Sequence, residues 1–546
     1  MNVGTTCNTT VADTGLLPAS IQSSRRWILF LVFAFAFFLI LNNHSILVPE
    51  RGDQAMWDYM AQAIVRGQVP YRDVVNIKTP LSAYISALAI LVGKAFGFNQ
   101  LIAIRYVGLI EAGVLMVVTF AVARAYTRSL LAATVSVLVP LTWERLYYFA
   151  SAGTEPKLPM ILFGMLSLLL IHKNKPFWAG FASMLSCLCW QPGLLFTGTA
   201  VLVFSNYLRG WRDGRAARTL IGAALPVLVM TTYFYFAGGL GELWKWCFVF
   251  DLTSYAPSAY KGFGDKVDHI SAVVGRTFTR TGIVILIAAA AGFVMFFVRV
   301  TGLLHRPARA ESVRPLQAGS AGGALLLAPL VYLIYLRFDF NAFPYLIPLI
   351  PFIGVFAGYF ASSLIGVPGT GLPGIARILG RLTWSRPRRP ESRPNNSANR
   401  PFPRIELRTC AGFIVAALAA YLAVSTSVRT RYTGSTLGDE YTLVQPLADA
   451  LEATDEIWAQ GEINVLVLLE RPNASKYIWF DRGKDDFAAQ DTGGFQHLLD
   501  EIEARKPKFV ALGRMEGVHH RNEIDQWISE HYLPFPMLGF QVYIRQ

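Results

Sequence analysis

Charged residues are scarce in this chain of 546 residues. They make up 16% of the sequence, against about a quarter in an average soluble domain. Hydrophobic residues reach 53%, and the mean hydropathy is +0.40. This composition excludes an ordinary soluble protein and predicts a polytopic membrane protein.

Cysteine and glycine-rich motifs are also too sparse to organise a site. The five cysteines are scattered and have no histidine at ligand spacing, which excludes a disulfide framework and a structural zinc site. No glycine-rich nucleotide-binding loop is present, so a nucleotide cofactor is not predicted. The first residues, about 20, lack a cleavable signal pattern, and we expect the first apolar run to remain as a membrane anchor.

Long apolar runs are the main feature of the sequence. A bilayer requires roughly 20 apolar residues, with some tolerance, and about eleven such runs occur. They lie at 27–44, 101–123, 127–142, 157–172, 177–190, 193–208, 217–237, 281–299, 320–336, 344–365 and 409–427. The apolar segment 81–96 is short, so we expect it to dip into the membrane interface.

Lysine and arginine accumulate in the connections that this span count places on one side. They occur before the first span, in the short loops near 124–128, 173–175, 209–218 and 299–314, and in the arginine-rich stretch 377–408. The last stretch has the composition of a disordered basic loop. The pattern predicts a cytoplasmic amino-terminal tail, 1–26, and an extracytoplasmic carboxy-terminal region, most simply across an inner or plasma membrane. The net charge of +13 follows from this topology and from anionic-lipid contact, so nucleic-acid binding is not predicted.

The sequence becomes more polar from residue 428 onward. We expect strands at 463–469, 506–512 and 539–545, with helices at 494–505 and 520–532. The predicted fold class is therefore an all-α polytopic membrane domain, 27–427, followed by a small external α/β domain, 428–546. The size of this α/β domain is usual for one domain, and its sequence contains no catalytic motif.

The first external loop, 45–100, contains the densest polar passage, from Glu50 to Leu81. Its first half, 53–66, has the pattern of an amphipathic helix at a membrane interface. Turn-forming residues in 67–80 predict an ordered loop. Asp53 is placed either to cap the helix or to act as a catalytic residue. Lys78 is placed either to reach lipid headgroups or to bind a phosphate at the membrane surface.

The order of these residues resembles the first external loop of polyprenyl-phosphate-sugar-dependent glycosyltransferases of the GT-C fold. The protein O-mannosyltransferase and lipid A aminoarabinose transferase group is the most similar. The matching elements are Asp53-Gln54, Tyr59, Ala61, Gly67, Pro70-Tyr71-Arg72-Asp73 and Lys78-Thr79-Pro80-Leu81. In that family the first acid of an acidic pair is catalytic, and a Lys-Pro-Pro-Leu element helps to hold the donor phosphate. Here Gln54 replaces the second acid and Thr79 replaces one proline.

Three later positions fit the same resemblance. Glu155 precedes Pro156 and a span, where an acid can cap the helix or face a cavity; the resemblance implies a place near the catalytic acid. Gln191 lies in a Trp-Gln-Pro-Gly turn, which is either a tight hairpin or part of the same cavity. Tyr345 begins a Tyr-x-x-Pro-x-x-Pro entry to a late span, and the preceding Arg337 is a candidate second phosphate contact.

The resemblance implies sugar transfer from a polyprenyl-phosphate donor to a hydroxyl of a lipid, glycan or protein acceptor, with inversion. Asp53 and Glu155 are the expected catalytic residues, with Asp53 as general base. Lys78, with Arg72 or Arg337, is expected to bind the donor phosphate. The other residues expected to line the cavity are Asp58, Tyr71, Asp73, Tyr147, Gln191 and Tyr345.

Some alternatives stay open. Tyr147 lies at a membrane boundary, where aromatic residues usually form an interfacial belt. No cofactor is certain, although Asp53 and Glu155 could share a divalent cation. A lipid-linked sugar transporter would show inverted internal repeats, which are not visible in the sequence. An inactive GT-C homologue is the remaining alternative, favoured by Gln54.

Overall fold

The computed structural model describes residues 19–50, 52–206, 209–255, 263–302, 315–366, 407–513, 515–537 and 539–546. By length and composition, five of the described helices can cross a membrane: Gln100–Thr127, Arg215–Phe236, Arg280–Thr301, Phe343–Ile365 and Thr409–Arg429. Shorter apolar helices include Arg26–Asn42, Lys157–His172 and Ala321–Leu336. Every span expected from the sequence overlaps one of the apolar helices. Most of the basic loop expected at 377–408 lies outside the described residues.

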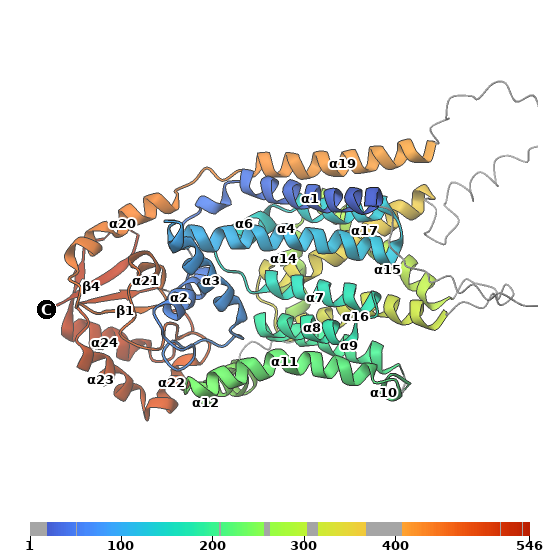
Figure 1. The fold of residues 1–546 in the computed structure, drawn as a ribbon. Coiled ribbons are helices and arrows are strands. Elements are labelled where there is room, and N and C mark those ends of the chain that lie inside the picture. The colour runs from blue at the N-terminus through green and yellow to red at the C-terminus, as the bar shows by residue number, and fades with distance from the viewer. Residues whose placement is uncertain are drawn as a thin grey trace, which may run out of the picture.

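The apolar helices run side by side in one bundle (Figure 1). They are α1 (Ala19–Asn42), α4 (Gln100–Thr127), α5 (Leu130–Leu138), α7 (Lys157–His172), α8 (Pro176–Cys189), α9 (Leu194–Ser205), α11 (Arg215–Phe236), α15 (Arg280–Thr301), α16 (Pro315–Leu336), α17 (Ile350–Ile365) and α19 (Leu407–Arg429). Short helical elements connect them: Ser45–Leu47, Pro140–Thr142, α6 (Glu144–Ser151), Gln191–Gly193, α10 (Arg209–Arg212), α12 (Leu240–Trp244), the π-helix Lys245–Tyr255, α14 (Phe263–Thr277) and Phe343–Leu349.

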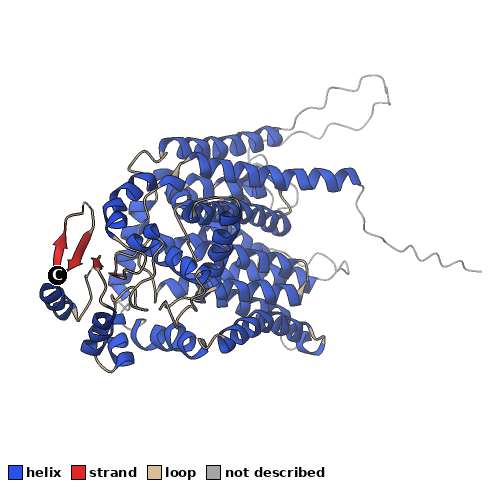
Figure 2. Cartoon of the chain, turned by 60° about the vertical axis from the view of Figure 1, so that its left-hand side comes forward, coloured by secondary structure: helices blue, strands red, loops and turns tan. Residues whose placement is uncertain are grey.

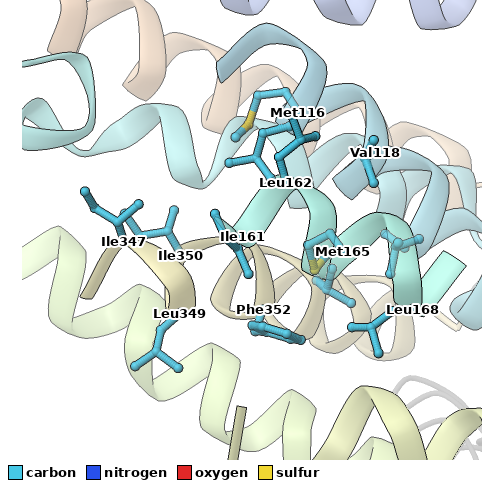
Figure 3. Packing of buried hydrophobic residues seen from close by; sticks show 14 of the residues in the cluster. Met116, Val118, Ile161, Leu162, Met165, Leu168, Ile347, Leu349, Ile350 and Phe352 are labelled. Carbon is cyan, nitrogen blue, oxygen red and sulfur yellow. The ribbon is translucent and has the colours of Figure 1, made fainter. Parts of the chain in front are cut away.

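The centre of the bundle is filled by apolar side chains of α4, α7 and α17. Figure 3 shows side chains from these helices, Met116 of α4, Leu162 and Met165 of α7 and Phe352 of α17, which belong to one cluster of buried residues. Dispersion contacts between such close-packed side chains, rather than water exclusion, hold helices together where lipid surrounds them.

Small residues allow α8 and α11 to approach closely. A Cβ atom added at Gly180 of α8 would collide with the carbonyl oxygen of Thr219 in α11, and one at Gly222 of α11 would collide with the carbonyl oxygen of Phe177. The two glycines therefore let the backbones touch, as small residues do at membrane helix interfaces.

The opening loop lies between the bundle and the carboxy-terminal sheet (Figure 1). It forms α2 (Gly52–Val65) and α3 (Leu81–Ala95), which pack against each other. The helix expected at 53–66 is thus present, but nine of the 14 residues of α2 are buried. Its apolar face is covered by α3 and by the carboxy-terminal region, and its place at a membrane interface stays a prediction.

The carboxy-terminal region contains a four-stranded sheet with order β1-β2-β4-β3. Figure 2 shows red strands beside the carboxy terminus. Strand β1 (Ile457–Gln460) pairs in parallel with β2 (Phe509–Leu512), whereas β4 (Gln541–Arg545) is antiparallel to both β2 and β3 (Tyr532–Phe535). The accompanying helices are α20 (Leu437–Ala450), α21 (Asn464–Leu469), α22 (Lys484–Thr492), α23 (Phe495–Arg505) and α24 (Arg521–His531).

Two of the three expected strands overlap β2 and β4, and both expected helices are present as α23 and α24. The strand expected at 463–469 is wrong, because these residues form the buried helix α21. A short, fully buried apolar run has no amphipathic period, so its sequence does not distinguish a strand from a helix.

Hydrogen bonds fix the carboxy-terminal region to the opening loop. The backbone N–H of Asn473 donates to the Tyr59 hydroxyl at 2.7 Å, and the Gln62 side chain donates to the carbonyl of Val467 at 3.0 Å. The backbone N–H of Val75 also donates to the carbonyl of Lys476 at 2.8 Å. These bonds join the opening loop to the carboxy-terminal region at three points.

Candidate active site

A polar cavity of about 170 Å³ lies where the opening loop, the bundle and the carboxy-terminal region meet. Its walls come from α2, the segment 75–78, the start of α7, Trp190, the segment 341–345 and the segment 478–484. The charged residues on the walls are Asp53, Lys78, Lys157, Asp481, Arg482 and Lys484. Sequence positions more than 400 residues apart (53 and 484) thus share one cavity.

Asp53 lies in the first turn of α2 and is exposed on the cavity wall. The preceding Gly52 has a φ of 60°, a left-handed conformation that suits glycine at the start of the helix. An acid in the first turn also interacts favourably with the helix dipole. The exposed carboxylate can receive a proton from a molecule in the cavity.

Lys78 is held by its backbone and by an ion pair. Its carbonyl oxygen accepts a 2.5 Å hydrogen bond from the Tyr71 hydroxyl, and its N–H donates to Asn76 Oδ1 at 3.1 Å. Its Nζ lies 3.7 Å from Asp251 Oδ1. Burial raises the pKa of Asp251, and the charge of Lys78 opposes that rise.

Lys78 also lines a second cavity of about 420 Å³. Its other walls are Gln191, Pro192, Leu194, Leu195, Asp251, Val331 and Tyr335, from the ends of α9 and α16 and the π-helix. This second cavity is a mostly apolar groove between bundle helices. Lys78 therefore stands where a polar cavity meets an apolar groove.

Lys157, which the sequence did not single out, is a further basic residue of the polar cavity. Its Nζ lies 4.8 Å from the ring centre of Trp190 and 5.0 Å from that of Tyr345, within cation–π range. It also lies 3.0 Å from Glu155 Oε1. These contacts fix the ammonium group beside Trp190 and Tyr345 on the cavity wall.

Glu155 does not share the cavity of Asp53. Its side chain is 5% exposed and is paired with Lys157, and it lines a separate small cavity of about 10 Å³ that also contains Glu111. Asp53 and Glu155 thus line different cavities, and Lys157, the ion-pair partner of Glu155, lines the cavity of Asp53.

Arg72, Asp73 and Arg337 are not among the residues that line either cavity. Arg72 is 44% exposed, bonds Asp73 at 2.8 Å and donates to the carbonyl of Ala237 at 2.6 Å. Asp73 also accepts from the N–H of Val69 at 2.7 Å. The expected roles of Arg72 and Arg337 at the donor phosphate, and of Asp73 on the cavity wall, are not supported by these positions.

Asp58, Tyr71 and Tyr147 are buried and are not among the residues that line either cavity. Asp58 accepts from the N–H of Thr154 at 3.0 Å. Burial raises its pKa to about 6, with Thr154 and Arg105 acting against the rise. Tyr147 donates to the carbonyl of Ala423 at 3.2 Å. Tyr71 supports Lys78, as described above.

Tyr345 lines the same cavity as Asp53, whereas Gln191, expected in that cavity, lines the apolar groove. Gln191 lines the apolar groove and donates to the carbonyl of Ile77 at 2.7 Å, which ties the turn after α8 to the opening loop. Tyr345 lines the polar cavity, and its hydroxyl accepts from Asn341 at 3.0 Å.

One group of side chains in the described part of the chain has the geometry to hold a metal ion. Asp485, Asp486 and His519 offer ligand atoms within 4.8 Å of one another. None of the three lines the polar cavity.

Comparisons with known proteins agree with this architecture. ArnT from Cupriavidus metallidurans bound to undecaprenyl phosphate superposes with a TM-score of 0.58 and 12% identity, over 95% of this chain and 97% of that one. Its apo form superposes with a TM-score of 0.57 and 12% identity, over 95% and 98% of the two chains. The chain has the GT-C fold. The fold expected from the opening loop is therefore confirmed.

Sequence comparison adds a partial match. The dolichol phosphate-mannose mannosyltransferase of Haloferax volcanii is 25% identical over 203 residues, 37% of this chain. The match spans 43% of that relative, less than half of its length. No protein-family model matches the chain.

Proposed function

We propose that this GT-C protein is a membrane glycosyltransferase that moves a sugar from a polyprenyl-phosphate donor to a hydroxyl acceptor. One observation carries the proposal: Asp53 and Lys78, from the two ends of the opening loop, line one polar cavity, and Lys78 also lines an apolar groove. The name of the Haloferax relative and the undecaprenyl phosphate bound to ArnT agree with such a donor.

The donor enters from the apolar groove. Leu194, Leu195 and Val331 offer the apolar surface that an isoprenoid chain needs, and Lys78 stands at its polar end. The 3.7 Å separation of Lys78 Nζ and Asp251 Oδ1 is longer than a strong charged hydrogen bond of about 2.8 Å, and in this proposal the donor phosphate becomes the closer partner of Lys78.

The sugar then lies in the polar cavity beside Asp53. Asp53 takes the proton of the attacking hydroxyl as the oxygen bonds the anomeric carbon, and the bond to the phosphate oxygen breaks. Lys78 and Lys157 stabilise the negative charge that grows on the leaving phosphate. Direct attack from the side opposite the phosphate inverts the anomeric carbon.

The topology is part of the proposal. We place about eleven spans within 27–427 and an extracytoplasmic α/β domain at 428–546, with the amino terminus in the cytoplasm. The cavity residues and the sheet all lie at one end of the bundle (Figure 1), which agrees with a reaction on the extracytoplasmic side.

The test is transfer of radiolabelled sugar from a panel of polyprenyl-phosphate sugars in membranes that contain the wild-type chain. We expect transfer from at least one donor and a product of inverted anomeric configuration, read by NMR. Membranes with normally expressed protein that transfer no sugar from any donor would contradict the enzyme assignment. A retained configuration would contradict direct attack.

A further inference from the structure

The side of the polar cavity opposite the bundle belongs to the carboxy-terminal region. We call the segment Ile478–Lys484 the outer wall; five of its residues line the cavity, namely Ile478, Trp479, Asp481, Arg482 and Lys484. Asp53 lines the same cavity, and once the donor phosphate is at Lys78 the acceptor would lie beside Asp53 and the outer wall.

Polar contacts fix the outer wall in place. Just before it, the carbonyl of Lys476 accepts from Val75 of the opening loop at 2.8 Å, and the Tyr477 hydroxyl donates to Asp491 of α22 at 2.7 Å. Asp491 is also paired with Lys245 of the π-helix. The outer wall is thus held against both the opening loop and the bundle.

Two consecutive residues of the outer wall have left-handed backbones. Arg482 has a φ of 57° and Gly483 a φ of 77°. A glycine is free to adopt this conformation, but an arginine is uncommon there, and such residues concentrate at functional sites. Arg482 thus occupies a position where the backbone conformation would favour glycine.

The charged lining of the cavity is mainly basic. Four of its side chains are cationic (Lys78, Lys157, Arg482 and Lys484) and two are anionic (Asp53 and Asp481). Arg482 Nε lies 3.8 Å from Asp481 Oδ2, and Lys484 also pairs with Asp481, so the two outer-wall cations share this carboxylate. Burial lowers the pKa of Lys484, and the negative charges of Asp481 and Asp53 oppose this effect. A further anion beside Lys484 would favour its charged form.

We infer that the outer wall binds an anionic group of the acceptor, a phosphate or carboxylate near the hydroxyl that receives the sugar, through Lys484 and Arg482. This inference rests on the proposed function, which assigns Lys78 to the donor phosphate. The carboxy-terminal region is then a part of the active site that selects the acceptor, and a neutral acceptor of the same shape binds less well.

The experiment measures binding to the purified full-length chain in detergent micelles. The probes are glycerol 3-phosphate and glycerate as anionic acceptor fragments, glycerol as their uncharged match, and undecaprenyl phosphate for the donor site. Wild-type protein is expected to bind either or both anionic fragments at least tenfold more tightly than glycerol, since hydrogen bonds to charged groups contribute roughly this much.

The variants separate the two sites. Lys484→Gln and Arg482→Gln are each expected to weaken fragment binding about tenfold and to leave undecaprenyl phosphate binding within about twofold. Lys78→Ala is expected to weaken undecaprenyl phosphate binding and to leave fragment binding nearly unchanged. Lys484→Arg keeps the charge and should restore most of the fragment binding. Retained lipid binding shows that each outer-wall variant is folded.

Several outcomes would overturn the inference. The first is that wild-type protein binds neither anionic fragment better than glycerol. The second is that the outer-wall variants bind the fragments normally. The third is that Lys78→Ala abolishes binding of the fragments and of the lipid together. If wild-type protein fails to bind undecaprenyl phosphate while the fragments behave as expected, the donor assignment fails and the anion subsite on the outer wall stands.

Discussion

Replacement of Glu155 by glutamine distinguishes a catalytic acid from a positioning residue. Glu155 and Lys157 form a 3.0 Å ion pair, and their side chains are only 5% and 12% exposed. Breaking a buried pair by removing one charge costs about 3–5 kcal/mol. Glutamine keeps the shape and one acceptor oxygen, so we expect a loss of about 2 kcal/mol in stability.

The effect on transfer should be modest, because Lys157 keeps its contacts with Trp190 and Tyr345. A less firmly placed ammonium group stabilises the leaving phosphate less well, and we expect kcat to fall about tenfold. Loss of a general base costs about 10²–10⁴-fold, the range expected for Asp53→Asn.

The assay is the pH dependence of transfer for wild-type protein and for Glu155→Gln, with thermal unfolding measured on the same preparations. In the proposed mechanism Asp53 is the base, so the acidic limb of the pH profile stays in the Glu155→Gln variant. A variant that loses as much activity as Asp53→Asn, together with that limb, would refute the positioning role and make Glu155 the base.

Two further predictions concern the scaffold. Burial raises the pKa of Asp58 from 3.8 to about 6, so the folded state binds the extra proton and stability falls as pH rises from about 4 to about 6. Asp58→Asn should remove this pH-dependent loss of stability, which amounts to up to about 3 kcal/mol. Thermal unfolding of both proteins at pH 4.5 and 7.5 measures the loss, and a variant with the pH dependence of the wild type would contradict the prediction. Gly180→Ala should destabilise the chain by about 1–3 kcal/mol, because the new Cβ would collide with the Thr219 carbonyl oxygen of α11. Gly198→Ala in α9, where a Cβ meets nothing within 4 Å, is the matched control, and equal thermal midpoints for the two variants would refute the close approach of α8 and α11.

The sequence predicted what local patterns encode. Apolar runs located the bundle helices, and the amphipathic pattern of 53–66 located α2. The order of polar residues in the opening loop pointed to Asp53 and Lys78, which do line one cavity. These features depend on residues that are close in sequence.

The rest depends on tertiary contacts that local patterns do not contain. Lys157 was missed because its role comes from Trp190 and Tyr345, which only the folded bundle brings to it. The outer wall was missed because 478–484 carries no motif and reaches Asp53 through the packing of the carboxy-terminal region. Arg72 was misplaced for the converse reason: its motif position matches the family, but its side chain turns to Asp73 and Ala237.

The central claim is that Asp53 and Lys78 act on one bound donor, and the most direct measurement is sugar transfer by four variants at equal expression. Asp53→Asn and Lys78→Ala change the site, whereas Asp500→Asn and Lys94→Ala change exposed residues of the same types that line neither cavity. We predict that both site variants lose at least about 10²-fold in transfer and that both controls transfer like the wild type. Transfer by Asp53→Asn or Lys78→Ala at the level of its control would contradict the account.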